Sequence, residues 1–192
     1  MDALSVDRLK EIASVRGIEY SFEDDPDPLI VQSTLAKSFP ITQEDMFDAF
    51  ADPVAHVGLF PIIVGSTPPI RKGLEGILPE NEFYAFEHVQ ESNLPPRIML
   101  VRYTLNRPFS IYKEAATDPF SIGVEAMDKK KGRVVMKFDR INENETKLTA
   151  SSTFHAETGS VFARGFIDRV WLNFFERMMF ANGQIEEKDY LT

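Results

Sequence analysis

The chain has 192 residues, 43% of them hydrophobic and 27% charged, which is typical of a globular protein that builds its own apolar core. It contains no cysteine, so disulfides, thiolate metal sites and thiol nucleophiles are excluded. The formal net charge of −9 makes nucleic acid an unfavourable partner, because its phosphate backbone is also negative.

The first 28 residues are expected to form a helical extension and a linker. Apolar residues recur at helical spacing from Leu4 to Val15, Gly17 is a typical helix stop, and the acidic, proline-broken segment 23–28 follows. The extension either docks on the main body or hangs from it, and its apolar face favours docking. It lacks the apolar core of a signal peptide, and no run in the chain reaches the ~18 apolar residues of a membrane span. We therefore expect a cytoplasmic protein without a transmembrane segment.

The next part of the chain predicts one strand followed by two short helices. Leu29–Phe39 alternates between apolar and polar positions, as a half-buried strand does. One short helix is expected over Gln43–Ala51 and a second over about Val54–Phe60. His56, in the second helix, lies either at the mouth of a pocket or on the solvated side, which is favoured. Prolines and glycines punctuate residues 62–80, which predicts one or two short, bent strands there.

From residue 81 the pattern changes to strands separated by turns. Apolar residues alternate with polar ones in each strand, and the connections are short, which predicts an antiparallel meander. The expected strands are Phe83–Glu91, Arg97–Asn106, Phe109–Ala116, Phe120–Met127, Arg133–Ile141 and Thr146–Ala156.

A long helix is expected over Ser160–Asn182, ending at Gly183. Its apolar residues cover more than half of its circumference, whereas a helix on a flat surface needs a stripe of a little over ~100°. Such a helix requires apolar contact on three sides, as it would have in the grip of a curved sheet. At ~1.5 Å per residue it spans about 34 Å, the length of a ten-residue strand.

Together these elements predict an α+β fold. A curved antiparallel sheet of six to seven strands grips the long C-terminal helix, two short helices follow the first strand of the sheet, and an extra helix precedes it. The expected divisions are residues 1–28 as the extension and linker, 29–183 as the ligand-binding domain, and 184–192 as an acidic tail. Because a strongly curved sheet cannot close on a helix along its whole length, an apolar cavity is expected near the two short helices.

Inward-facing residues of the strands and the apolar face of the long helix would line this cavity. These ligand-binding candidates are Met99, Val101, Tyr103, Phe109, Ile111, Met136, Phe138, Phe154, Ile167, Val170, Trp171, Phe174 and Met178.

Few polar residues are candidates for chemistry in such a cavity. Tyr103 is either a core tyrosine or a group whose hydroxyl orients an apolar ligand. Glu87 and His88 are candidates for moving protons, but as neighbours on one strand they point to opposite faces, and the pattern leaves the inward side open. Arg164 and Asp168, four residues apart on the long helix, form either a structural ion pair or a charge that orients the polar end of a ligand.

Motifs for metals, cofactors and nucleophilic serine are absent from the sequence. Histidines at HxH or HExxH spacing, a dinucleotide-binding fingerprint, a P-loop and a GxSxG serine are all missing. We therefore expect neither a metal nor a cofactor.

The order and spacing of several short segments carry a family resemblance. They are the strand Leu29–Phe39, Pro40-Ile41-Thr42 before the first short helix, Asp52-Pro53 between the short helices, Asn93-Leu94-Pro95-Pro96 before a strand, and Glu145-Thr146-Lys147-Leu148-Thr149 opening the last strand. Residues 29–183 resemble the START-like helix-grip (SRPBCC) superfamily, which includes polyketide cyclases and dehydrases, lipid-transfer domains and pathogenesis-related plant allergens. The glycine-rich loop of the plant members is missing, because Arg71–Gly76 supplies only two glycines. The resemblance implies a helix-grip fold with an apolar pocket more strongly than it implies an activity.

Three functions are consistent with these observations. The first is a noncatalytic carrier or sensor of an apolar small molecule, such as a lipid, fatty acid, sterol-like compound or polyketide. The second is a polyketide-type cyclase, aromatase or dehydratase in which Tyr103, His88 or Glu87 moves protons. The third is an interaction module whose long helix or N-terminal helix joins a second subunit, in which case the protein would form a homodimer.

Overall fold

The computed structural model describes residues 3–27, 29–73, 76–90, 97–116, 132–155 and 160–191. The strand expected over Phe120–Met127 lies outside these residues. Within them, the main element is an eight-stranded antiparallel sheet with the order β1-β2-β10-β9-β8-β7-β6-β3. Its strands are β1 (Glu19–Asp24), β2 (Ile30–Phe39), β3 (Ile63–Ser66), β6 (Glu82–Val89), β7 (Arg97–Asn106), β8 (Ser110–Ala115), β9 (Gly132–Asn142) and β10 (Glu145–His155). A separate two-stranded ribbon consists of β4 (Lys72–Gly73) and β5 (Gly76–Ile77).

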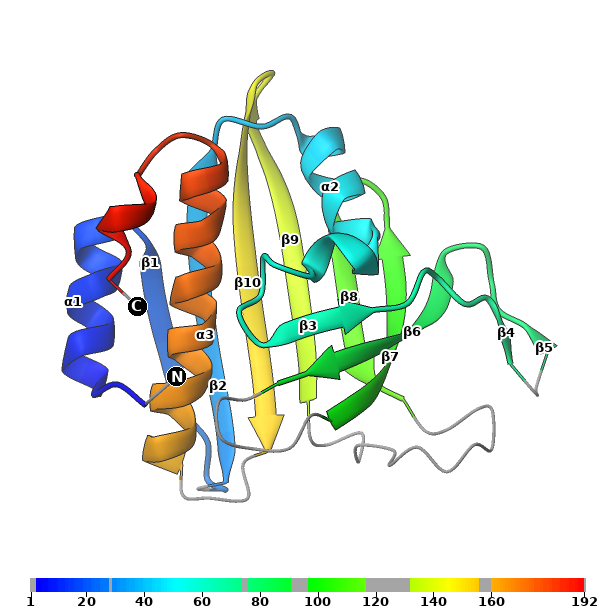
Figure 1. Ribbon diagram of the computed structural model, residues 1–192, viewed down its shortest axis with the longest axis horizontal. Helices are drawn as coiled ribbons and strands as arrows, with labels where there is room; N and C mark the ends of the chain where they lie inside the picture. Colours follow the sequence, from blue (N-terminus) through cyan, green and yellow to red (C-terminus); the bar gives the residue numbers. More distant parts are fainter. Residues whose placement is uncertain are drawn as a thin grey trace.

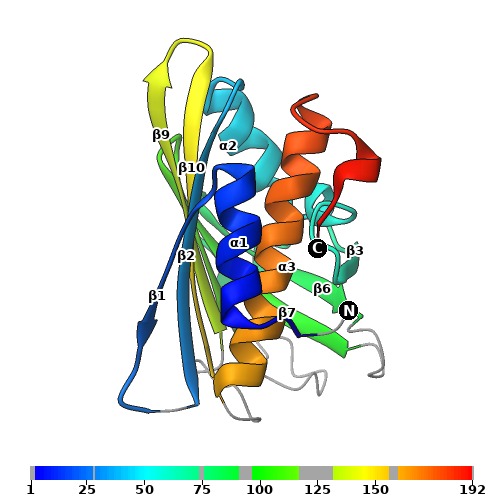
Figure 2. The same ribbon diagram turned by 90° about the vertical axis from the view of Figure 1, so that its left-hand side faces the viewer.

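The sheet is strongly curved. In Figure 1, β2, β10 and β9 run along the vertical direction of the view, whereas β3, β6 and β7 run across it. The helices all lie on the concave side, as Figure 2 shows from the side. They are α1 (Val6–Arg16), α2 (Gln43–Ala51), the short 3-10 helix η1 (Pro53–His56), α3 (Ser160–Ala181) and the 3-10 helix η2 (Glu187–Asp189). The predicted fold class is therefore confirmed, with eight strands in the described sheet instead of six to seven.

Local signals in the sequence fix several helix ends. The Thr42 side chain accepts a hydrogen bond from the Asp45 backbone N–H at the start of α2. Gly17 follows α1 and Gly183 follows α3, and both have the positive φ that favours glycine at a helix end. Neither α3 nor any other helix in the described ranges combines the length and the apolar character that crossing a bilayer requires.

The N-terminal extension packs on the rest of the molecule. β1 pairs with β2 along its whole length, and sequence analysis had not predicted this strand. The Leu4 backbone N–H donates to the Gly165 carbonyl at 3.2 Å, and Arg16 pairs with the buried Glu176 of α3 at 2.7 Å. Glu176 also accepts from the Leu191 backbone N–H at 3.0 Å, so the extension and the C-terminal tail are both fixed to α3. The extension thereby covers one of the three sides on which α3 needs apolar contact.

Aromatic rings fill the space between α3 and the sheet beside the short helices. Phe50 of α2 stacks on Phe138 of β9 at 5.8 Å and meets Phe174 of α3 edge-on at 5.7 Å. Phe60, which follows η1, stacks on Phe174 at 4.3 Å and meets Trp171 edge-on at 5.3 Å. These rings occupy the region where the sequence predicts a cavity.

Candidate functional site

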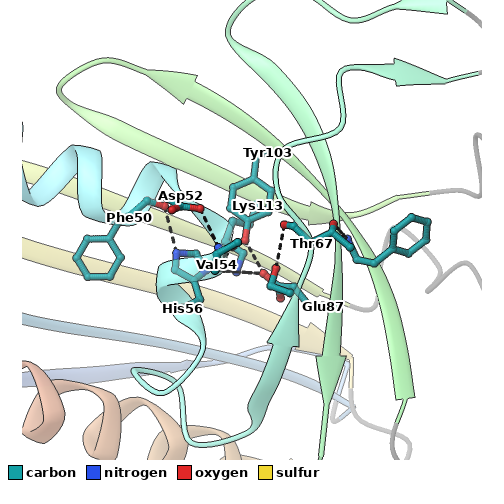
Figure 3. A network of polar contacts seen from close by, with 10 residues as sticks. Phe50, Asp52, Val54, His56, Thr67, Glu87, Tyr103 and Lys113 are labelled. Atoms are coloured by element: carbon teal, nitrogen blue, oxygen red, sulfur yellow. Dashed lines mark hydrogen bonds and ion pairs between the residues drawn. The ribbon is translucent and has the colours of Figure 1, made fainter.

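Four buried polar side chains meet inside this aromatic core, and we call them the buried tetrad: His56, Glu87, Tyr103 and Lys113 (Figure 3). They come from η1, β6, β7 and β8, and their exposed fractions are 0%, 4%, 0% and 8%. Strand alternation explains the last three, because each lies at an inward-facing position of adjacent strands, and Tyr103 pairs directly with Lys113 in the β7–β8 register.

His56 reaches the tetrad because η1 begins immediately after α2. The Asp52 side chain accepts from the Val54 backbone N–H at 3.0 Å and fixes the start of η1, which Pro53 also favours. The turn then directs the imidazole inward, where Nε2 lies 3.1 Å from the Phe50 carbonyl oxygen. A carbonyl only accepts hydrogen bonds, so Nε2 carries the hydrogen of the neutral ring and Nδ1 is left as an acceptor.

Glu87 is the centre of the network. The Lys113 Nζ donates to Glu87 Oε1 at 2.8 Å, and the Tyr103 hydroxyl donates to the same oxygen. His56 Nδ1 lies 3.1 Å from the Tyr103 hydroxyl and 3.4 Å from Lys113 Nζ. The ammonium group also lies over two aromatic faces, 4.9 Å from the Tyr103 ring centroid and 5.6 Å from that of Phe60.

The surroundings fix the protonation states of the tetrad. Burial alone would raise the pKa of Glu87, but the Lys113 charge and the neighbouring His56 outweigh it, so this pKa lies well below its usual range. Burial and the Lys113 charge lower the pKa of His56, and Glu87 offsets this only in part. Burial and the Glu87 carboxylate raise the pKa of Tyr103 well above its usual value. At neutral pH the carboxylate is ionised, whereas the imidazole and the phenol are neutral.

A buried network of charged and polar side chains is energetically costly compared with apolar packing. Removing an ion pair from water costs several kcal/mol for each charge, and apolar residues of similar volume often stabilise a protein equally well. Titratable groups with shifted pKa values and specific partners, gathered at one interior point, are therefore candidates for function.

Comparison with known proteins identifies the architecture. No family model and no curated protein sequence matches this chain. Among solved structures, a STAR-related lipid transfer protein from Xanthomonas axonopodis has a TM-score of 0.63 at 12% identity, over 88% of this chain and 94% of that chain. The human StarD13 lipid transfer and protein localization domain has a TM-score of 0.62 at 10% identity, over 88% and 85%. The Zhui aromatase/cyclase from Streptomyces sp. R1128 has a TM-score of 0.53 at 10% identity, over 79% and 96%.

This chain has the START-like helix-grip fold. The identities are 10–12%, so the comparison establishes the fold alone.

The helix-grip structure brings some of the predicted polar candidates together and separates others. Tyr103 and Glu87 are in direct contact. His88 is exposed, because the alternation of β6 directs Glu87 inward, so the idea that His88 reaches the interior is wrong. The expectation of a solvated His56 is also wrong, since its side chain is fully buried. Sequence reasoning missed Lys113, because a lysine in an alternating strand looks like any solvated charge.

The predicted lining residues of the helix-grip domain are mostly in the packed core. Val101, Ile111, Met136, Phe138, Val170, Trp171, Phe174 and Met178 are buried, and Met99, Phe154 and Ile167 are half-buried. Phe109 is an exception: it is 57% exposed, because it precedes β8 in the turn after β7 and the strand begins only at Ser110. Its assignment to the cavity lining is wrong.

Two open hollows on the described surface of the helix-grip domain lie away from the predicted lining residues and from the tetrad. One, of about 500 Å³, is lined by Asp48, Ala51, Asp52, Val54, Pro68 and Pro69. The other, of about 370 Å³, lies over β1, β2 and β10 and is lined by Glu19, Tyr20, Ser21, Thr34, Ala36, Lys147 and Thr149. Neither contains a predicted lining residue or a member of the tetrad, so the internal cavity stays a prediction.

Arg164 and Asp168 of α3 contact the N-terminal part of the chain. Arg164 donates to the Gln32 carbonyl at 3.1 Å and to the Glu23 carbonyl at 3.2 Å. Asp168 accepts from the Tyr20 hydroxyl at 2.5 Å. Burial raises the pKa of this carboxyl, although hydrogen bonds and the Arg164 charge oppose the shift. These contacts assign both residues to the attachment of β1 and β2 to α3.

Proposed function

We propose that this helix-grip domain binds an apolar small molecule between the concave face of the sheet and α3, in the space that the Phe60 ring now occupies. The observation that carries the proposal is the position of this ring. It is contributed neither by the sheet nor by α3, but by the connection between η1 and β3, and it lies against Trp171, Phe174 and His56. The ring therefore fills the meeting point of the helix, the aromatic core and the tetrad.

The connection that carries Phe60 turns at a glycine and is packed on its inner side only. It contains Gly58, which has φ 89° and open space where a Cβ would lie. Val57 is 39% exposed, so the outer side of the connection is not packed into the core. Arg177 of α3 donates to the Gly58 carbonyl, and the Val57 and Phe60 backbone N–H groups donate to the Val54 and His56 carbonyls at 3.1 Å. These bonds and the ring stacking hold the connection closed.

Burial of the Phe60 ring and burial of an apolar ligand group contribute similar free energies. Burying a phenylalanine side chain contributes ~1.5–3 kcal/mol, and an apolar ligand group of the same size contributes as much. A ligand that replaces the Phe60 ring and also buries further apolar surface is therefore favoured over the closed state. The fold supports the proposal as well, because proteins described as lipid transfer domains and as an aromatase/cyclase share it.

The only tryptophan of the chain makes the proposal testable. Trp171 is 3% exposed and in contact with Phe60, so its fluorescence responds to displacement of the ring. Titration with 1,6-diphenylhexatriene, an uncharged apolar dye, should quench Trp171 and saturate at one dye per chain. Phe60→Ala should tighten binding, because the space is already free, and Phe60→Leu should give an intermediate result if the alanine variant is unstable.

Phe109→Ala is the matched control, since it makes the same substitution at an exposed position. It should leave the dye affinity unchanged. Absence of saturable dye binding, or equal affinities for the Phe60 and Phe109 variants, would overturn the proposal.

A second function, acid–base catalysis of the cyclase, aromatase or dehydratase type, is favoured by one feature of the tetrad. The Tyr103 hydroxyl donates its single hydrogen to Glu87, and the acceptor Nδ1 of neutral His56 lies 3.1 Å from the same oxygen, so rotation of the hydroxyl would direct this hydrogen to the imidazole instead. Here Tyr103→Phe would abolish turnover of a polyketide-like substrate while dye binding persisted. Unchanged turnover in this variant would exclude a catalytic role for the phenol.

A further inference from the structure

We infer that the ligand carries a neutral hydrogen-bond acceptor, such as a ketone or ester oxygen, at the end that reaches the tetrad, and that Lys113 binds this oxygen. The inference rests on the proposed function and names the class of ligand. It follows from the number of hydrogen bonds that Lys113 can make and from the position of Phe60.

Lys113 has more donors than acceptors around it. An ammonium group has three N–H donors. Among the described residues, Lys113 Nζ has two acceptors, Glu87 Oε1 at 2.8 Å and His56 Nδ1 at 3.4 Å. The faces of the Tyr103 and Phe60 rings also lie beside this nitrogen. The closed state thus satisfies the third donor with aromatic faces instead of a hydrogen bond.

Displacing Phe60 changes this balance. Once the ring leaves, one of the two aromatic faces beside the ammonium is lost, and the ammonium group borders the vacated space. A hydrocarbon in that space leaves a buried N–H without an acceptor, which is costly because the group cannot return to water. A ligand oxygen at the same place restores the hydrogen bond.

The charges of the tetrad favour an uncharged ligand group over a charged one. Glu87 already neutralises Lys113, with 2.8 Å between the charged atoms and both residues buried. A ligand carboxylate would place a second negative charge beside Glu87 in the same low-dielectric space, and a ligand ammonium would repel Lys113. An uncharged oxygen on an apolar body satisfies the donor without either penalty.

A set of ligands of equal chain length tests the inference: dodecane, 2-dodecanone, dodecanoic acid and dodecylamine. Each is titrated against the full chain, with displacement of diphenylhexatriene and recovery of Trp171 fluorescence as readouts. We expect 2-dodecanone to bind about tenfold or more tightly than dodecane, the factor that corresponds to about 1.4 kcal/mol. The acid and the amine should bind more weakly than the ketone.

Substitution of Lys113 completes the test. Lys113→Met keeps the apolar stem and should remove the preference for the ketone while dodecane still binds. If this variant fails to fold because Glu87 is left unpaired, the double variant Glu87→Gln/Lys113→Met removes both charges and serves instead. Lys147→Met, on the outer face of the sheet, is the control and should retain the preference.

The outcomes separate the two proposals. Equal binding of ketone and alkane, tighter binding of the acid, or a preference that survives in Lys113→Met would overturn this inference and leave the proposed function standing. Failure of every ligand and of the dye to bind would overturn the proposed function itself.

Discussion

The ion pair between Glu87 and Lys113 gives the most direct test of the energetics of the core. Glu87→Gln leaves the Lys113 ammonium buried without its carboxylate, and Lys113→Met leaves the carboxylate without its ammonium. Both residues are more than nine-tenths buried and their charged atoms lie 2.8 Å apart. Breaking one side of such a pair costs about 3–5 kcal/mol, because the remaining charge cannot be solvated.

The double variant should recover much of this loss. In Glu87→Gln/Lys113→Met both charges are gone, the glutamine can still accept from Tyr103, and the methionine fills the volume of the lysine stem. We expect the double variant to be more stable than either single variant, with a coupling energy of about 3 kcal/mol. The total stability of a domain is only about 5–15 kcal/mol, so each single variant should lose a large fraction of it.

Urea unfolding at pH 7, followed by Trp171 fluorescence and circular dichroism, measures these differences. The solvent-accessible pair of Lys147 and Glu19, with side chains 30% and 71% exposed, has a similar separation, 2.7 Å, and provides the control. Lys147→Met should cost about 0–1 kcal/mol. Single variants at Glu87 and Lys113 whose losses are below 1 kcal/mol and simply add in the double variant would refute the reasoning.

The same pair predicts a dependence on pH. The pKa of Glu87 lies below its value in the unfolded chain, so the unfolded chain binds the proton first as pH falls. The stability that the carboxylate contributes is therefore complete above about pH 4.5 and is lost in more acidic solution. The gap in stability between the wild type and Glu87→Gln should narrow as the pH is lowered from 5 towards 2.

Three further predictions concern other buried groups. Because burial lowers the pKa of His56, the imidazole is protonated at a higher pH in the unfolded chain than in the folded one, and the urea midpoint should fall as pH decreases below about 6.5. The midpoint of His56→Gln should vary less with pH. An identical pH dependence of the variant and the wild type would contradict this prediction. Burial raises the pKa of Asp168, so the folded chain favours its neutral form and loses stability as pH rises above about 3.8. Asp168→Asn should thus be more stable than the wild type at pH 7 by about 1 kcal/mol but not at pH 4. Thermal melts in which the variant is less stable than the wild type at both pH values would contradict this prediction. A Cβ on Gly165 would lie 2.3 Å from the Leu4 carbonyl oxygen, so Gly165→Ala should lower the free energy of unfolding in urea by about 1–3 kcal/mol. Deletion of residues 1–4 should cancel this loss. Equal losses in the full chain and in the shortened chain would speak against the clash.

Local patterns in the sequence determined most of the fold. Alternation in residues 97–106 and 133–156 predicts which side chains of β7, β9 and β10 face inward, and the structure confirms this for Tyr103 and Phe138. The wide apolar surface of α3 predicts a helix held on several sides, and both sheet and extension contact it. β1 was missed because its alternation is short: only Tyr20 and Phe22 alternate with polar residues in the acidic segment Glu19–Asp24, and pairing with β2 completes the strand.

The candidate site, in contrast, depends on the tertiary structure. Periodicity shows which face of a strand is apolar, so it predicts that Tyr103 is buried. It cannot show that Lys113 and Glu87 share that interior, because a charged side chain is buried only where a partner from another strand satisfies it. That partner is set by strand order and register, and for His56 by the turn of η1. Residue patterns along the chain thus account for the apolar frame, whereas the polar groups that meet inside it depend on how strands and helices pack.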